Sequence, residues 1–145
     1  MVSYWDTSAL VPLLVKEADT ALREKQLSSI AGLVTWWGSR LECLSALCRR
    51  EREGYLDAES FLMARRRLEA VGRQWIEVPP SNSVRARAER LLRIHPLRAA
   101  DSLQLASALL AVNESTEGVG FYCADTRLSE AASREGFEVF PGVTA

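Results

Sequence analysis

The chain has 145 residues, of which 48% are hydrophobic and 26% are charged, values typical of a soluble globular protein. This length fits one domain, residues 1–145, with enough residues to build its own core. No apolar run approaches the roughly 20 residues that a membrane-spanning helix requires, so we expect no membrane partner. The net charge of −1 by itself indicates no class of partner.

Short apolar segments alternate with helical segments along the chain. The predicted strands are Val2–Trp5, Leu33–Thr35, Ile76–Val78, Val119–Cys123 and Phe137–Phe140. The predicted helices are about Ser8–Glu17, Thr20–Ser28, Gly38–Glu53, Ala58–Gln74, Ser83–Ile94, Ser102–Val112 and Arg127–Glu135. Short apolar strands between helices predict an α/β fold, in which helices cover both faces of a mostly parallel sheet of four or five strands.

The three cysteines, Cys43, Cys48 and Cys123, have no disulfide-framework spacing, and we expect reduced thiols in a cytoplasmic protein. Cys43 and Cys48 are five positions apart, so on one helix they point in different directions and form a poor metal-binding pair. No Lys or Arg precedes Lys16, and Asp6 interrupts the first apolar segment. We therefore expect no secretory signal peptide.

Basic residues are concentrated in the middle of the chain. From Arg40 to Arg98 there are 13 Arg, no Lys and 8 acidic residues, a net charge of +5, whereas the rest carries 5 basic and 11 acidic groups, a net charge of −6. Arg favours bidentate contacts with phosphate. A solvated helix face explains the same residues, because Glu is interleaved at helical spacing in RRERE and MARRRLEA. Both interpretations stay open at this point.

Several carboxylates stand where a predicted strand meets a helix. Asp6 ends the first strand, Asp125 ends the strand in VGFYCADTRLSEAA, and Asp101 opens the helix in LRAADSLQLASALL. Sheets of this kind carry their sites at the carboxyl ends of the strands. Taken singly, each of these Asp residues is also explained as a helix N-cap, and Asp101 with Gln104 fits a capping box.

Asp101 and Glu42 fit a purely structural role less well. Asp101 is aligned with the apolar stripe of its helix, where a carboxylate is costly unless its charge is compensated. Glu42 lies early in the predicted helix Gly38–Glu53, where no cap is needed. The helical neighbours of Glu42 are all small and leave room for a ligand, although an exposed helical Glu is the alternative. These neighbours are Gly38, Ser39, Ser45 and Ala46.

Four segments together resemble the motifs of PIN-domain ribonucleases, most closely the toxins of VapBC-type toxin–antitoxin modules. The segments are YWDTSALVPLLVKE, SRLECLSAL, RAADSLQLASALL and FYCADTRLSEAASREGFEVF. They follow the family's order over nearly the whole chain, so the resemblance implies a single PIN domain with a PIN-like three-layer fold. The family's four acidic residues match Asp6, Glu42, Asp101 and Asp125.

The smaller matches concern the residues beside these acids. Thr7 and Ser8 match the small hydroxyl residues that follow the first acid, and we expect them to hydrogen-bond within the site. In such toxins His is frequent three residues after the third acid, whereas this chain has Gln104 there. That difference neither supplies nor removes a metal ligand.

The resemblance implies a metal-dependent endoribonuclease toxin that hydrolyses RNA, a cognate small antitoxin as partner, and a homodimer. Carboxylate oxygens suit Mg²⁺ or Mn²⁺, and two such ions can activate a water and stabilise the leaving oxygen of a phosphodiester. We expect Asp6 and Asp101 to be the main metal ligands. Glu42 is expected to be a ligand or to hold a metal-bound water, and Asp125 to be a second-ion or outer-shell ligand.

Other site chemistries have less support in the sequence. The only histidine, His95, precedes Pro96 and is expected on a loop surface, and no G-x-S-x-G elbow or glycine-rich phosphate loop is present. The pair Trp36–Trp37 is interpreted either as a platform for RNA bases or as core or interface. A phosphoacceptor receiver domain requires a late lysine, but the lysines are Lys16 and Lys25. The alternative function is a non-catalytic PIN-like binding or scaffold module.

Overall fold

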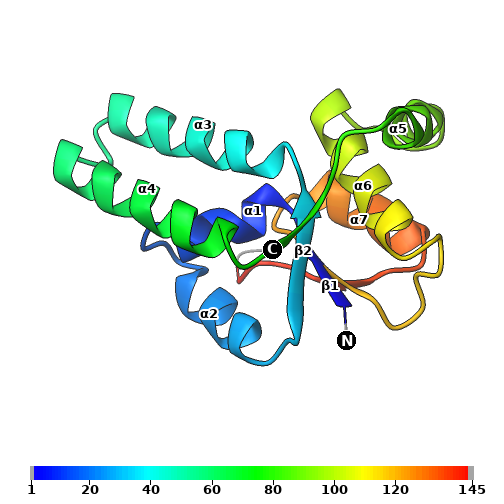
Figure 1. Ribbon diagram of the computed structural model, residues 1–145, viewed down its shortest axis with the longest axis horizontal. Coiled ribbons are helices and arrows are strands. Elements are labelled where there is room, and N and C mark those ends of the chain that lie inside the picture. Colours follow the sequence, from blue (N-terminus) through cyan, green and yellow to red (C-terminus); the bar gives the residue numbers. More distant parts are fainter. Residues whose placement is uncertain (1, 144–145) are drawn as a thin grey trace.

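The computed structural model describes residues 2–143, in which helices cover both faces of a parallel sheet (Figure 1). The strands are β1 Val2–Trp5, β2 Gly32–Trp36, β3 Ile76–Val78, β4 Gly120–Tyr122 and β5 Glu138–Phe140. Their order is β3-β2-β1-β4-β5, and every neighbouring pair is parallel. The predicted α/β fold with a mostly parallel sheet of four or five strands is confirmed.

The helices lie close to their predicted positions, with two exceptions. They are α1 Thr7–Leu10, the 3₁₀ helix η1 Val11–Leu13, α2 Thr20–Ser28, α3 Ser39–Arg52, α4 Ala58–Gly72, α5 Asn82–Ile94, α6 Ala99–Ala111 and α7 Thr126–Arg134. The predicted helix Ser8–Glu17 is too long, because Pro12 has no N–H to donate and its ring disfavours an α-helical turn before it. Helix α6 begins at Ala99, before the predicted start at Ser102.

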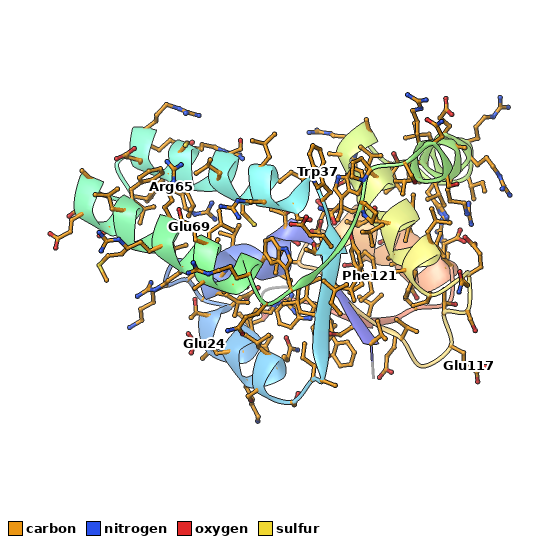
Figure 2. The ribbon with its side chains drawn as sticks, viewed as in Figure 1. Glu24, Trp37, Arg65, Glu69, Glu117 and Phe121 are labelled. Carbon is orange, nitrogen blue, oxygen red and sulfur yellow. The ribbon has the colours of Figure 1, made fainter. Side chains whose placement is uncertain are left out.

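Successive strand residues face opposite layers of the core, as expected for a parallel sheet buried on both sides. Tyr4 stacks on Phe121 with ring centroids 5.3 Å apart, in the core beneath α5, α6 and α7. Trp5 stacks on Tyr122 at 4.6 Å, in the core beneath α1, α3 and α4. Figure 2 shows Phe121 in the interior, whereas Glu117 points outward. The fold therefore has three layers, with the sheet in the middle.

The strand order determines where a site can form. The chain leaves the central strand β1 for β2 on one side and later returns to β4 on the other side, so β1 and β4 flank the point where the order reverses. In open α/β sheets a crevice forms at the carboxyl ends of the strands at such a point. The Asp6 N–H donates to the Tyr122 carbonyl at 3.0 Å, so the segments that follow β1 and β4 lie side by side there.

His95 does not lie on a loop surface, and that prediction is wrong. Its side chain is buried, and its Nε2 atom lies 2.6 Å from Oε2 of Glu135 at the end of α7. Arg87 on α5 faces the same carboxylate at 3.6 Å. The partner of His95 stands 40 positions later in the chain, so the local pattern His95–Pro96 carries no sign of it.

Two further expectations concern the cysteines and membranes. Cys43, Cys48 and Cys123 are all free, and both Cys43 and Cys123 are buried. Among residues 2–143, no helix combines the length and the apolar character needed to cross a membrane.

Candidate active site

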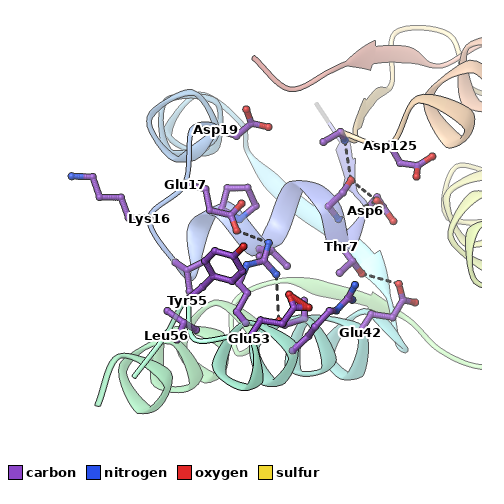
Figure 3. Close-up of a pocket in the computed structure, with 18 of the residues that line it drawn as sticks. Asp6, Thr7, Lys16, Glu17, Asp19, Glu42, Glu53, Tyr55, Leu56 and Asp125 are labelled. Atoms are coloured by element: carbon purple, nitrogen blue, oxygen red, sulfur yellow. Dashed lines mark hydrogen bonds and ion pairs between the residues drawn. The ribbon is translucent and has the colours of Figure 1, made fainter. Parts of the chain in front are cut away.

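A cleft of about 870 Å³ lies where the segments after β1 and β4 meet. Figure 3 shows Asp6, Glu42 and Asp125 at one end of the cleft, and Tyr55 and Leu56 at the other. All of the residues that the sequence singled out for a site line this cleft, although they come from four separated motifs. They are Asp6, Thr7, Ser8, Glu42, Asp101 and Asp125.

Asp6 is both a helix cap and a buried carboxylate of the cleft. As N-cap of α1 it has extended backbone angles, and its Oδ2 accepts hydrogen bonds from Ser8 N at 3.0 Å and Ser8 Oγ at 2.6 Å. Only 5% of Asp6 is exposed. Burial raises the pKa of its carboxyl, and the hydrogen bonds from Ser8 oppose that shift. The capping role therefore does not exclude Asp6 from a site, because the same residue lines the cleft.

Ser8 and Cys123 complete the surroundings of Asp6. Ser8 Oγ accepts a hydrogen bond from Ala124 N at 2.8 Å, which ties α1 to the segment after β4. Cys123 Sγ lies 3.6 Å from the Asp6 Oδ2 atom. Burial raises the pKa of the Cys123 thiol to about 12, so the group stays protonated and is a weak donor rather than a thiolate ligand.

Glu42 projects from the first turn of α3 and is half-buried. Its Oε1 accepts a hydrogen bond from Thr7 Oγ1 at 3.0 Å, and Gln104 Nε2 lies 3.3 Å from Oε1 and 3.4 Å from Oε2. Burial raises the pKa of Glu42, and the negative charges of Asp6 and Asp101 raise it further. The hydrogen bonds from Thr7 and Gln104 act in the opposite direction. Glu42 is therefore not the freely exposed helical residue of the alternative interpretation.

Asp101 does not cap its helix, so the capping-box interpretation is wrong. The N-cap of α6 is Arg98, without a side-chain cap, and Gln104 points to Glu42 rather than back to the helix start. Asp101 is half-buried in the first turn. Burial raises the pKa of Asp101, and the charges of Asp125 and Asp6 add to the shift. This is the energetic cost that its alignment with the apolar stripe predicted.

Asp125 is exposed and caps α7, since its Oδ1 accepts a hydrogen bond from Leu128 N at 2.9 Å. Within residues 2–143, no three His, Cys, Asp or Glu side chains form a compact group arranged for a metal ion. The four acids are each held by their own donors or by their helix, and the charges of neighbouring acids raise the pKa values of Glu42 and Asp101. They line one acidic cleft and do not form a preformed cage.

The sequence does not identify every residue beside the cleft. From the sequence, Gln104 neither supplies nor removes a metal ligand, but in the structure its amide contacts Glu42. Its place on the buried stripe of α6 indicated burial, whereas nothing in the sequence showed what it faces. Arg49 and Arg50 of the RRERE run line the cleft, together with Lys16. Part of the basic segment therefore faces the site rather than bulk solvent alone.

The parallel five-stranded sheet, its two helical layers and the acidic cleft between β1 and β4 define a PIN-like α/β fold. The structure is similar to VapC20 of Mycobacterium tuberculosis, a toxin that cleaves the sarcin–ricin loop, with a TM-score of 0.67 and 16% identity over 94% of this chain and 96% of that one. The predicted PIN-like fold is thus confirmed.

Two other solved structures share this fold. VapBC2 from Rickettsia felis, solved bound to a DNA fragment from its promoter, has a TM-score of 0.67 and 11% identity, over 97% of this chain and 99% of that one. PAE2754 from Pyrobaculum aerophilum has a TM-score of 0.64 and 20% identity, over 96% and 89% of the two chains. No protein-family model and no curated protein matches the sequence.

Proposed function

We propose that this chain is a single-domain, Mg²⁺- or Mn²⁺-dependent endoribonuclease and the toxin of a VapBC-type module. The observation that carries the proposal is the cleft, where carboxylates from four separated segments meet at the reversal point of a PIN-like sheet. VapC20, which shares the fold, is a toxin that cleaves the sarcin–ricin loop. We further propose that the protein acts as a homodimer in the cytoplasm, where its three free cysteines stay reduced.

The residues of the cleft fit a hard divalent cation. The available donors are carboxylate and hydroxyl oxygens, which Mg²⁺ and Mn²⁺ prefer, and the nearby thiol of Cys123 stays protonated. Burial raises the pKa values of Asp6, Glu42 and Asp101, and repulsion from neighbouring acids raises those of Glu42 and Asp101 further, a cost that a bound cation would offset.

Each acid has a proposed role toward the ion. Asp6 and Asp101 would be the main ligands, Glu42 a ligand or the holder of a metal-bound water, and Asp125 a second-ion or outer-shell ligand. When bound, the metal would supply Lewis-acid activation of water and of the scissile phosphate. Ser8 holds the Asp6 carboxylate and Thr7 holds that of Glu42, so both acids are fixed at the wall of the cleft.

The lining of the cleft also offers cations for the RNA backbone. Arg49 is exposed, whereas Arg50 is already engaged by Glu17, whose Oε1 lies 2.5 Å from Arg50 Nη2. Lys16 is exposed beside them. Phosphate contacts of this kind position a nucleic acid without reading its sequence, so they support RNA as substrate without selecting one.

The alternative function is a non-catalytic binding or scaffold module, and the absence of a compact group of metal ligands within residues 2–143 favours it. A nuclease assay distinguishes the two functions. With purified protein and a structured RNA, we expect cleavage in millimolar Mn²⁺ and none in EDTA. Folded protein that binds this RNA but leaves it intact at every Mn²⁺ concentration supports the binding or scaffold module instead.

The proposed partner is a small antitoxin that covers the acidic cleft and places a basic side chain among the carboxylates. Expression of the chain alone is expected to arrest growth, and co-expression with the small protein encoded beside it to restore growth. The Asp6→Asn variant serves as control, since it should not arrest growth but should still bind the partner. Growth arrest that persists in the presence of that partner contradicts the toxin–antitoxin assignment.

A further inference from the structure

Gln104 lies directly beneath the cleft, where it is 1% exposed and does not line the cavity. Tyr4 Oη donates a hydrogen bond to its Oε1 at 2.5 Å. Its Nε2 lies 3.0 Å from Ser39 Oγ, 3.2 Å from Thr7 Oγ1, and 3.3 and 3.4 Å from the two carboxylate oxygens of Glu42. Every polar atom of this buried amide therefore has a partner in the described structure.

These contacts leave the amide one orientation. The Tyr4 hydroxyl donates to the amide oxygen, so the amide nitrogen faces Ser39, Thr7 and Glu42 and can donate to them. The reversed amide would place its oxygen against the Glu42 carboxylate, which can only accept hydrogen bonds, so that orientation is unfavourable. The contact with Glu42 thus selects this orientation, and the hydrogen bond from Tyr4 supports it.

The surrounding network joins four elements of the fold. Ser39 Oγ shares a hydrogen bond of 2.7 Å with Thr35 Oγ1 at the end of β2, and Thr35 also bonds the carbonyl of Trp5 at 2.7 Å. Helix α6 is thereby linked through Gln104 to the ends of β1 and β2 and to the start of α3. A buried network with all its members paired holds its groups in one arrangement.

We infer that Gln104 is a positioning residue that, with Thr7, holds the Glu42 carboxylate at the cleft wall where it would meet the metal. The inference rests on the proposed function. Gln104 does not line the cleft, so it would act on a bound ion only through Glu42, whose flexible side chain loses rotamer freedom when it is fixed. Partners of this kind typically change metal affinity by about 10–100-fold when they are removed.

The test replaces Gln104 with Met, which has similar volume but no amide. For the full-length Gln104→Met variant we expect Mn²⁺ to bind about 10–100-fold more weakly than to wild type in a calorimetric titration. The Mn²⁺ concentration for half-maximal RNA cleavage should rise by the same factor. Ser107→Ala is the matched control, because it removes a buried hydrogen bond of 2.7 Å to Leu103 one turn along α6, outside the cleft. This control should keep wild-type Mn²⁺ affinity.

Tyr4→Phe tests the orientation of the amide separately. It removes only the hydroxyl that fixes the Gln104 oxygen, so we expect a smaller loss of Mn²⁺ affinity in the same direction. If Gln104→Met does not fold, the inference is tested with Tyr4→Phe alone. An Mn²⁺ affinity of Tyr4→Phe equal to that of wild type then overturns the inference. If wild type and Gln104→Met both bind Mn²⁺ equally and cleave, the inference fails while the proposed function stands. If wild type neither binds Mn²⁺ nor cleaves RNA, both fail.

Discussion

Asp6→Asn and Asp101→Asn should each reduce Mn²⁺-dependent RNA cleavage by at least about 10²-fold, the scale on which one electrostatic group contributes to a reaction barrier. Both replacements keep the shape of the side chain and remove its charge. Asn at position 6 retains an oxygen that accepts the hydrogen bond from Ser8, and Asp101 has no cap to lose. The fold should therefore survive, so the loss is specific to the proposed metal site.

Two variants make this experiment specific. Asp57→Asn is the matched control, because Asp57 is also an N-cap, accepting from Ser60 N at 2.7 Å, but does not line the cleft. It should cleave like wild type. Asp125→Asn should lose less cleavage activity than Asp6→Asn and Asp101→Asn. Asp125 is exposed, and its proposed role is that of a second-ion or outer-shell ligand. Near wild-type cleavage by Asp6→Asn or Asp101→Asn, measured as initial rates on one RNA, removes that residue from the proposed site.

The sequence predicts the sheet well because local apolar runs and turn residues carry the signal. Strands Val2–Trp5 and Ile76–Val78 and helix Thr20–Ser28 are observed with the predicted bounds. Asp6 and Asp125 were placed correctly at strand ends by the same local reasoning, since a parallel sheet brings those ends to one edge. Helices, strands and the residues at strand ends can thus be predicted from residues that are close in sequence.

What the sequence could not show depends on partners far along the chain. The role of Gln104 requires Tyr4, which is 100 positions away, and the burial of His95 requires Glu135, which is 40 positions away. Asp101 resembled a cap because a capping box is a local pattern, whereas α6 begins earlier at Ala99. In each case tertiary packing determines the role of the residue, and the periodicity of the sequence does not show that role.

Without metal, the pH dependence of the protein's stability should reveal the cost of burying these carboxylates close together. The pKa values of Asp6, Glu42 and Asp101 are raised in the folded protein above their ordinary values of 3.8 for Asp and 4.5 for Glu. The folded state therefore binds more protons than the unfolded state between the ordinary and the raised values. Their contribution to stability is fully present below the ordinary pKa values and is lost as pH rises through the raised ones.

In EDTA, the melting temperature of wild type should accordingly rise, relative to that of Asp6→Asn, as the pH is lowered from neutral toward the ordinary pKa values of 3.8 and 4.5. The variant lacks one of the titrating groups and relieves the repulsion felt by Glu42, so its melting temperature should depend less on pH in this window. Identical pH profiles for the two proteins in differential scanning calorimetry contradict the repulsion within the cleft.

Bound metal should offset the repulsion among the carboxylates of the cleft and stabilise the folded protein. Mn²⁺ would bind the folded cleft but has no assembled site in the unfolded chain, so it should stabilise wild type by about 2.7 kcal/mol once free metal reaches a hundred times its dissociation constant. Asp101→Asn should lose most of this gain and yet melt no lower than wild type in EDTA at pH 7, because a half-buried repelling charge is gone and no cap is broken. Asp57→Asn should keep the full gain, since Asp57 lies outside the cleft. A wild type whose melting temperature does not move in millimolar Mn²⁺ rules out the four-carboxylate metal site.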